Sequence, residues 1–401
     1  MTARECVLTT LRHHQPARLP IDLGGTESSG LTSVAYNRLK QHLGLPLGGK
    51  VVDPYQHVVW VEEDVKRRFG VATEMLILEP KTWRDGRAPD GIPCRLPENW
   101  RTTVRPDGTE EALNAAGEVI GRRSASGYHF DPVNPPLASV ETASDLARHG
   151  DVIATYDWPA YADEGLESLV SRARRLHAET DRAVVFNYQV HVLAAGQILM
   201  GYERFMETLM LEPKLAEAFL TQLVDAYCER TACVLPALGD SIDVVLVNDD
   251  LGTQQGPMLS PALYRKMIKP HQHRLFAGIK AHTKAALLLH SCGSVRYAIP
   301  DLIEIGVDAL NPVQVSAARM DSAELKREFG KDITFWGGGC DTQHVLSRGT
   351  ARQVREEVKR RIGDFAPGGG FVFTQVHNIQ PEVPPENVVA MLEAAQELGA
   401  Y

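Results

Sequence analysis

The feature that most constrains the fold is a regular alternation of short apolar segments with longer segments of helical periodicity. Six apolar segments, predicted as strands, recur through the second half of the chain, at 183–189, 243–250, 285–291, 308–314, 333–338 and 371–377. Each is followed by a helical pattern, including a long run from 202 to 238 that Pro213 interrupts. Continuous apolar strands between helices are typical of a parallel sheet covered by helices.

Two further predicted strands, at 18–25 and 73–80, bring the total to eight. Eight strands favour an α/β fold of the (β/α)8 TIM-barrel type, with the active site at the carboxyl ends of the strands. An open doubly wound sheet is the alternative. No G-x-G-x-x-G motif opens a helix, so a dinucleotide-binding version of that sheet has no support.

The N-terminal part of the chain carries additions to this barrel. Thr2 and Glu5 form a capping-box pattern, which predicts an amphipathic helix over 2–14 as an N-terminal helical extension. Further helices are expected at 33–44, 58–70 and within 143–179. The stretch 81–133 is rich in turn signals between short alternating segments, and we predict a β-rich insertion there within a single domain, 1–401.

Charge and cysteine usage exclude several classes of function. The formal net charge is -9 and no cluster of Lys and Arg stands out, so nucleic acid and anionic membrane surfaces are poor candidate partners. No apolar run approaches the length of a membrane-spanning helix. The six cysteines lack the regular spacing of a disulfide framework, which favours reduced thiols and a cytoplasmic location.

Two predicted strands end on residues that bind metals. The segment AALLLHSCGS runs into His290 and Cys292, and ITFWGGGC runs into Cys340. An imidazole and two thiolates are ligands that Zn²⁺ prefers, and three protein ligands without a fourth are typical of a catalytic zinc. A buried structural histidine or cysteine is the alternative for each. The carboxylates considered as a fourth ligand are Glu27, Asp249 and Asp250, each of which also fits a solvated or capping position.

Other polar residues gather at the expected carboxyl ends of the strands. We predict His377 and Asp249 as catalytic residues, with His377 donating a proton to a departing oxygen or holding a polar group of the substrate. The predicted substrate contacts are Asn187, Tyr188, Asn311, Gln314 and Gln375. The alternative for all of them is a side chain that only satisfies the backbone of a neighbouring loop.

Several of these segments resemble the uroporphyrinogen decarboxylase superfamily, and the similarity extends over nearly the whole chain. It is carried by LPIDLGG, NDDLGTQQGPMLSP, HSCGSV, IEIGVDALNPVQ, WGGGCD and VHNIQPEVPPENV. The H-x-C pattern with a distant cysteine resembles the branch of corrinoid-dependent methyltransferases. The resemblance implies a (β/α)8 barrel, zinc on His290, Cys292 and Cys340, and a corrinoid-binding partner protein at the barrel mouth. A homodimer is left open.

One departure bears on the reaction. Decarboxylases of the superfamily carry an arginine-containing motif after their first strand, whereas IDLGGTESSG at 21–30 has no basic residue. Buried carboxylates of a porphyrinogen would lack a partner there. We therefore expect methyl transfer between a small donor, a methoxylated aromatic, and a corrinoid (cobamide) cofactor, free or protein-bound. The alternatives are methylcobamide:thiol methyl transfer of the coenzyme M type, a metal-free decarboxylase or lyase, and a zinc-stabilised binding protein.

Overall fold

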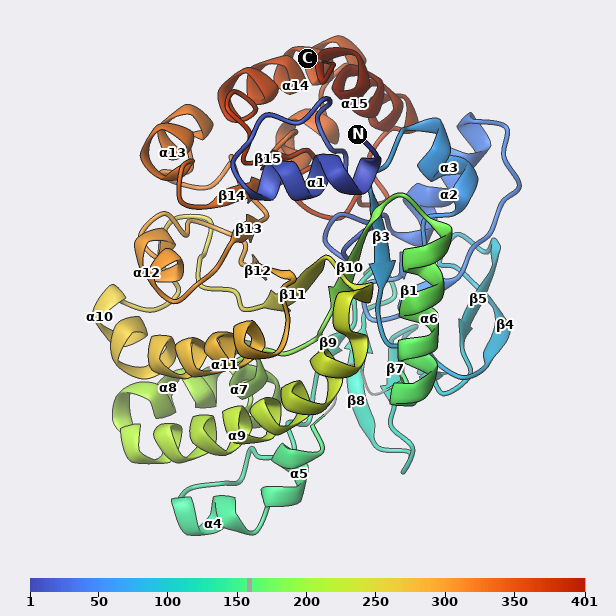
Figure 1. Ribbon diagram of the computed structural model, residues 1–401. Coiled ribbons are helices and arrows are strands. Elements are labelled where there is room, and N and C mark those ends of the chain that lie inside the picture. The colour runs from blue at the N-terminus through green and yellow to red at the C-terminus, as the bar shows by residue number, and fades with distance from the viewer. Residues whose placement is uncertain (157–160, 401) are drawn as a thin grey trace.

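A curved parallel sheet organises the computed structural model, which describes residues 1–156 and 161–400 (Figure 1). Seven strands lie in the order β15-β14-β13-β12-β11-β10-β3, and each pairs in parallel with its neighbours. Their bounds are β3 Thr73–Leu76, β10 Ala183–Asn187, β11 Val244–Asn248, β12 Ala286–His290, β13 Ala309–Asn311, β14 Thr334–Trp336 and β15 Phe371–Val372.

Ile21 closes this sheet into a barrel. It forms parallel bridges to Val71, just before β3, and to Phe373, just after β15. The segment around Ile21 therefore takes the eighth position between the two edge strands, and the predicted (β/α)8 fold is confirmed. The strand expected at 18–25 is shorter than predicted, because only isolated bridges at Arg18 and Ile21 form there.

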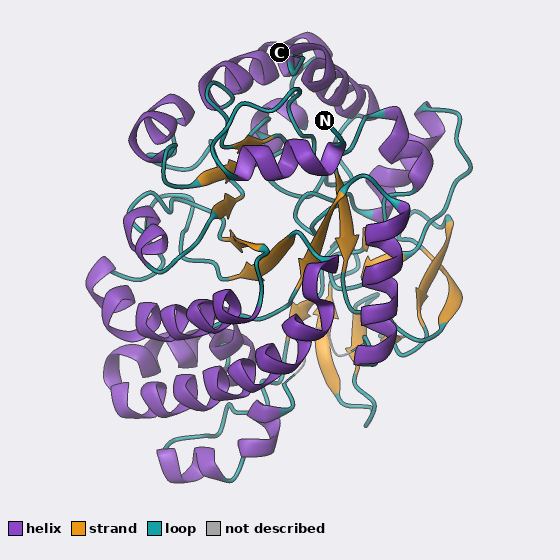
Figure 2. Cartoon of the chain, in the orientation of Figure 1, coloured by secondary structure: helices purple, strands orange, loops and turns teal. Residues whose placement is uncertain are grey.

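Helices form the outer layer around the barrel (Figure 2). The predicted break at Pro213 is confirmed, because this residue opens a helix of its own after α8. The helices of the second half are α7 Leu193–Met200, α8 Tyr202–Leu211, α9 Pro213–Leu238, α10 Pro261–Leu263, α11 Lys269–His282, α12 Ile299–Glu304, α13 Ser322–Phe329, α14 Ala351–Phe365 and α15 Pro385–Leu398.

The barrel interior is a small apolar core, separate from the larger core between strands and helices. Inward-facing residues such as Val185, Leu288 and Trp336 fill it. Ala3 and Val7 of α1 (Ala3–Leu11) belong to the same cluster, so the N-terminal helix packs against the interior of the barrel. The predicted capping box is present at the start of this helix.

The predicted β-rich insertion is confirmed between β3 and the helices that precede β10. It contains a hairpin of β4 (Trp83–Arg87) and β5 (Pro93–Pro97), and an antiparallel sheet of β6 (Arg101–Val104), β7 (Glu110–Leu113), β8 (Val119–Arg123) and β9 (Asp131–Pro132). The helices expected within 143–179 are α4 (Ala143–Ala147), α5 (Gly150–Ala154) and α6 (Leu166–Glu179). That the whole chain is one domain stays a prediction.

The prediction of a helix at 58–70 is wrong for the first half of that segment. Val58–Val59 form β2, which pairs with β1 (Val51–Asp53), and only Glu63–Arg68 form the helix α3. The β-branched residues of this segment favour a strand over a helix, and that preference decides its first half. The helix expected at 33–44 is present as α2 (Ser33–His42).

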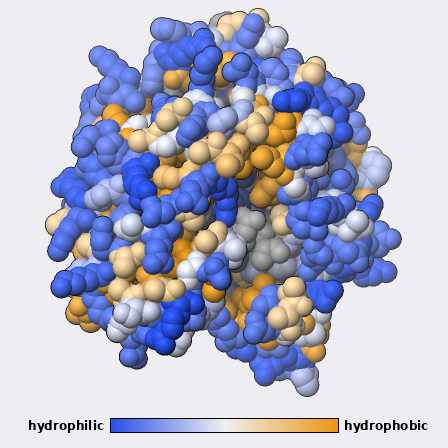
Figure 3. Space-filling view, turned by 60° about the horizontal axis from the view of Figure 1, so that its bottom comes forward, coloured by the Kyte–Doolittle hydropathy of each residue, from blue (hydrophilic) through white to orange (hydrophobic). Residues whose placement is uncertain are grey.

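The outer surface is predominantly polar on the face shown in Figure 3, where hydrophobic residues form several separate patches. Among the described residues, no helix combines the length and apolar character that crossing a membrane requires.

Candidate metal centre and cavity

The alternation of side chains along the strands brings polar groups to one end of the barrel. Leu288 faces the barrel interior, so His290, two residues further along β12, faces the same way. By the same alternation, Asn311 on β13 faces the interior, because Ala309, two residues before it, does so. The carboxyl ends of neighbouring parallel strands therefore place these two side chains together.

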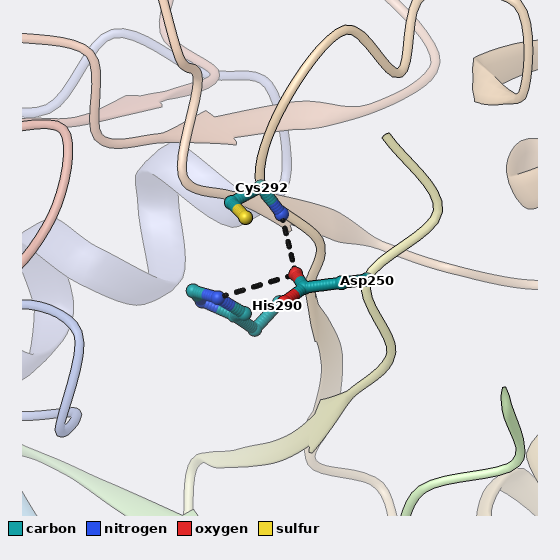
Figure 4. A group of neighbouring side chains, drawn as sticks. All are labelled: Asp250, His290 and Cys292. Atoms are coloured by element: carbon teal, nitrogen blue, oxygen red, sulfur yellow. Dashed lines mark hydrogen bonds and ion pairs between the residues drawn. The ribbon is translucent and has the colours of Figure 1, made fainter. Parts of the chain in front are cut away.

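Asp250, His290 and Cys292 form a compact group of potential metal ligands (Figure 4). Their ligand atoms all lie within 4.8 Å of one another. Asp250 follows β11, and its Oδ1 lies 3.7 Å from His290 Nε2. The same Oδ1 accepts a 2.8 Å hydrogen bond from the backbone N–H of Cys292, which fixes the carboxylate over the turn after β12.

Asn311 fixes the orientation of the His290 ring. The Nδ2 of Asn311 donates to the carbonyl oxygen of Trp336 at 3.0 Å, so its Oδ1 faces His290 Nδ1 at 2.9 Å. That oxygen also accepts from Ser28 Oγ at 2.7 Å. A neutral His290 must therefore carry its proton on Nδ1, which leaves Nε2, the nitrogen that faces Asp250, free to bind a metal.

The charges within the group favour an ionised Asp250. Withdrawal from water raises the pKa of Asp250, but the charge of a protonated His290 and the hydrogen bond from the Cys292 N–H outweigh it and hold that pKa below its usual value. Burial, followed by the negative charge of Asp250, raises the pKa of the Cys292 thiol. Without a metal, Cys292 is therefore a neutral thiol beside a carboxylate.

These three groups fit a zinc ion. They offer one nitrogen, one oxygen and one sulfur ligand, all of which zinc accepts, and the Nε2–Oδ1 separation of 3.7 Å matches two ligands about 2 Å from a shared ion. A histidine that binds a metal through one ring nitrogen is commonly oriented by a hydrogen bond at the other, and the contact of His290 with Asn311 is of this kind.

Cys340, the third ligand predicted from the sequence, lies outside this group. Its side chain is fully buried in the large core, and its Sγ contacts the carbonyl oxygen of Asp341 at 4.0 Å. Burial raises the pKa of this thiol, and Glu357 and Asp341 raise it further. In the structure Asp250, one of the considered fourth ligands, takes the place expected for Cys340.

Asp249, predicted as catalytic, anchors a helix. Its carboxylate accepts hydrogen bonds from the backbone N–H groups of Val192, Leu193 and Ala194, at 2.8–3.1 Å, and from Gln272 Nε2 at 2.8 Å. The three backbone groups begin α7, so Asp249 satisfies donors that a helix start leaves unpaired. Burial raises the pKa of Asp249 to about 6, an effect that these hydrogen bonds oppose.

The five predicted substrate contacts all have partners within the protein. Tyr188 faces outward from β10, where its hydroxyl lies 3.0 Å from Thr231 Oγ1 and its ring stacks on Phe186. Gln314 accepts from the backbone N–H of Gly293 at 2.7 Å and so holds the turn that carries Cys292. Asn187 donates to Gly25, Gln375 donates to Ser29, and Asn311 contacts His290 as described.

His377, the other predicted catalytic residue, lies beside the metal-binding group. Its ring centre is 5.6 Å from that of His290, and its Nδ1 is 2.9 Å from Asn378 Oδ1. Burial, with a smaller contribution from His290, lowers the pKa of His377 to about 4, so the imidazole is neutral near pH 7. A neutral ring with one nitrogen occupied can present the other nitrogen to a substrate.

Comparison with known proteins places this arrangement in a family. A family model described as uroporphyrinogen decarboxylase (URO-D) matches residues 190–398, which include the whole metal-binding group. The chain belongs to the URO-D family. Its curated relatives include uroporphyrinogen decarboxylases of Legionella pneumophila (strain Lens), 24% identical over 52% of this chain and 55% of theirs, and of Pseudomonas fluorescens, 28% identical over 36% and 39%. The chain thus spans about half the length, or less, of these relatives.

A solved structure extends the similarity to the complete fold of this URO-D family member. The methyltransferase from Methanosarcina mazei superposes with a TM-score of 0.59 and covers 99% of each chain, at 15% sequence identity. This likeness concerns the fold, and it includes the N-terminal part that the family model does not match.

The metal-binding group opens on a cavity of about 300 Å³. It is lined by Glu27, Ser28, Asp53, Tyr55, Gln56, Tyr161, Gln189, His191, Ala194, Ile198, Leu246, Asn248, Asp249, Asp250, His290 and His377. Neither lysine nor arginine lines it among the described residues. The sequence did not single out most of this wall, because residues 53–56 and Tyr161 come from segments outside the barrel strands.

Proposed function

We propose that this URO-D family member is a zinc-dependent methyltransferase that moves a methyl group between a small donor and a corrinoid. The donor we propose is a methoxylated aromatic, and the corrinoid arrives on a partner protein or as free cofactor. The fold shared with the Methanosarcina mazei methyltransferase supports the class of reaction. The cluster of Asp250, His290 and Cys292 beside the cavity is the observation that carries the proposal.

The protein's own residues would prepare the donor for transfer. When bound, zinc would supply Lewis acidity for the negative charge that develops on the departing oxygen. His290 offers Nε2 because Asn311 occupies Nδ1, and Asp250 is held in place by the Cys292 N–H. His377, neutral near pH 7, would donate or accept a hydrogen bond at the same oxygen.

The size of the cavity supports a small donor. A volume of about 300 Å³ is at the lower end of the range for small-molecule sites. One substituted aromatic ring suits that space, whereas a corrinoid is too large for it and would approach from the barrel mouth. Tyr55 and Tyr161 supply aromatic surface on one wall.

The lining also argues against porphyrinogen decarboxylation. Glu27, Asp53, Asp249 and Asp250 bring four carboxyl groups to the cavity, where the described residues offer neither lysine nor arginine. A substrate with several carboxylates would find no basic side chain to pair with there, at a cost of several kcal/mol per unpaired charge. A sulfonated thiol would meet the same penalty with its one anionic group.

Incubation of the purified protein with reduced cobalamin and a panel of methoxybenzenes, followed by the visible spectrum of the corrinoid, tests this proposal. We expect methylation of the corrinoid with methoxylated donors and its loss in Cys292→Ser. Demethylation of methylcobalamin by thiols, without methylation of the corrinoid by any methoxylated donor, would instead support the thiol methyltransferase alternative. No spectral change with any donor or thiol would contradict methyl transfer altogether.

A further inference from the structure

Two carboxyl groups, Glu27 and Asp53, lie in the cavity apart from the metal-binding group. Both line its wall, and Asp53 is 6% exposed. Glu27 belongs to the loop after Ile21, and Asp53 ends β1, so separate segments bring both carboxyls to one cavity, where the charge of Asp53 acts on Glu27. Asp250 belongs to the metal-binding group, whereas neither Glu27 nor Asp53 does.

The two carboxyls differ in their hydrogen-bond partners. Asp53 Oδ1 accepts from the backbone N–H groups of Tyr55, at 2.8 Å, and Gln56, at 3.4 Å. Glu27 accepts one hydrogen bond, from the neutral amide of Gln189 at 2.5 Å. Two backbone donors stabilise an ionised Asp53, whereas one amide compensates little of the cost of burying a charged Glu27.

The charges around the pair also favour a protonated Glu27 beside an ionised Asp53. Burial raises the pKa of Glu27 and the nearby charge of Asp53 raises it further, while Gln189 opposes the shift. Burial also raises the pKa of Asp53, against its backbone hydrogen bonds and the exposed His129. Tyr161 interacts with both carboxyls, and burial together with their charges raises the pKa of its phenol. Of these groups, His129 alone can carry a positive charge, and it acts on Asp53.

A third residue of the same cavity, His191, also indicates a polar ligand. His191 is 8% exposed and lines the wall, and its Nδ1 has no hydrogen-bond partner among the described residues. An unpaired buried nitrogen costs free energy until a ligand or water satisfies it. His191 stays neutral near pH 7, because burial lowers its pKa to about 4.

We propose that Glu27 and Asp53 share a single proton, and that Glu27 presents this proton as a hydrogen bond to an uncharged oxygen of the ligand. The cavity would then select neutral, hydroxylated or ether-bearing rings, with His191 as a second polar contact. Anionic rings would be disfavoured because they meet an ionised Asp53, and no lysine or arginine among the described lining residues offsets that charge. This rests on the proposed function only in naming the ligand as the methyl donor.

Three probes of nearly equal shape test the selection: meta-methoxybenzyl alcohol, meta-methoxybenzoate and meta-methoxybenzylamine. Their binding is measured by calorimetry on the full chain without corrinoid. We expect the neutral alcohol to bind at least about tenfold more tightly than the benzoate, since one unpaired buried charge costs more than the 1.4 kcal/mol that tenfold represents. Equal binding of both, or binding of none of the three, would overturn the proposal.

Two variants test the protonation of Glu27. Glu27→Gln keeps the shape and an N–H donor, so we expect alcohol binding within about threefold of the original protein. If Glu27 is instead an ionised carboxylate, the amine will bind best and Glu27→Gln will abolish that preference, which would contradict the shared proton. Glu229→Gln, an exposed change on α9, is the matched control.

An infrared measurement gives a second readout that does not depend on ligand binding. The protein near pH 7 should show a protonated carboxyl band that disappears in Glu27→Gln, and its absence from the original protein would overturn the proposal. If Glu27→Gln does not fold, Asp53→Asn serves instead, because removing the neighbouring charge should make Glu27 ionise more readily and weaken the band. Retained selection for neutral rings without methyl transfer would contradict the proposed function and leave this inference standing.

Discussion

His290 Nδ1 donates a 2.9 Å hydrogen bond to Asn311 Oδ1, across the carboxyl ends of two neighbouring strands. The contact decides which nitrogen of His290 faces Asp250, and with it the geometry of the proposed zinc site. Asn311 would therefore act on a bound metal through the histidine, and the substrate contact that the sequence predicts for it stays a prediction.

Asn311→Ala should lower zinc affinity about 10- to 100-fold, the usual effect of removing a residue that orients a metal ligand. Competition with a chelator of known affinity measures the change. Asn114→Ala, in an exposed turn of the insertion, is the control and should leave zinc affinity unchanged. Unaltered affinity in Asn311→Ala would show that His290 does not need this partner.

The composition of the metal site can be decided by metal analysis of three variants. We expect Asp250→Asn and Cys292→Ser to lose most bound zinc, and Cys340→Ser to retain it, because the Cys340 thiol lies outside the group. Loss in Cys340→Ser with retention in Asp250→Asn would instead support the ligands predicted from the sequence. Full retention in both Asp250→Asn and Cys292→Ser would contradict the site.

Zinc affinity should also fall as the pH falls. Burial and the charge of Asp250 raise the pKa of Cys292, so zinc must displace a proton from this thiol in order to bind. Zinc titrations over a series of buffers measure the effect, and Cys292→Ser should show a weaker pH dependence. An affinity independent of pH would indicate that the thiol is not a ligand.

Asp249→Ala should destabilise the fold by several kcal/mol, since three backbone N–H groups and Gln272 lose their acceptor, at about 1–3 kcal/mol for each group left unsatisfied. Urea unfolding measures the loss. Asp250→Asn, compared with the original protein in the absence of zinc, is the matched comparison and should change stability little, because the Asp250 side chain is 43% exposed. Unchanged stability with lost activity in Asp249→Ala would restore the catalytic role predicted for it.

His57 should contribute to loss of stability in acid. Burial lowers its pKa to about 4, with a further contribution from Arg123, whereas in the unfolded chain the value is about 6.5. The unfolded state therefore binds the proton first, and stability is lost as the pH falls from about 6.5 to about 4, by about 3 kcal/mol in total. The folded state at higher pH is unaffected.

His57→Asn should flatten this part of the stability–pH curve, and asparagine tolerates the positive φ of 56° at this position. Unfolding free energies from urea titrations near pH 7 and near pH 5 give the slope. His14→Asn, at an exposed site, should leave the slope unchanged. An unaltered slope in His57→Asn would assign the acid sensitivity to other groups.

Local patterns were sufficient for the order of the elements. Apolar strands and helical periodicity are properties of neighbouring residues, so the barrel, the insertion and the break at Pro213 could be predicted. The same patterns misjudged 58–70, where β-branched residues favour a strand. The alternation of side chains along β10 also places Tyr188 on the outer face of the sheet, because its neighbour Asn187 faces the interior.

The sequence by itself determined the barrel and the pair His290 and Cys292, because residues two apart at a strand end stay together in any fold that contains the strand. Only the tertiary structure decided the third member, since Asp250 comes from a neighbouring strand end and Cys340 turns into the core. It also decided the cavity, where Glu27 and Asp53 meet although no local pattern links them. Contacts between distant segments depend on how the whole barrel packs, and a sequence pattern carries no record of that packing.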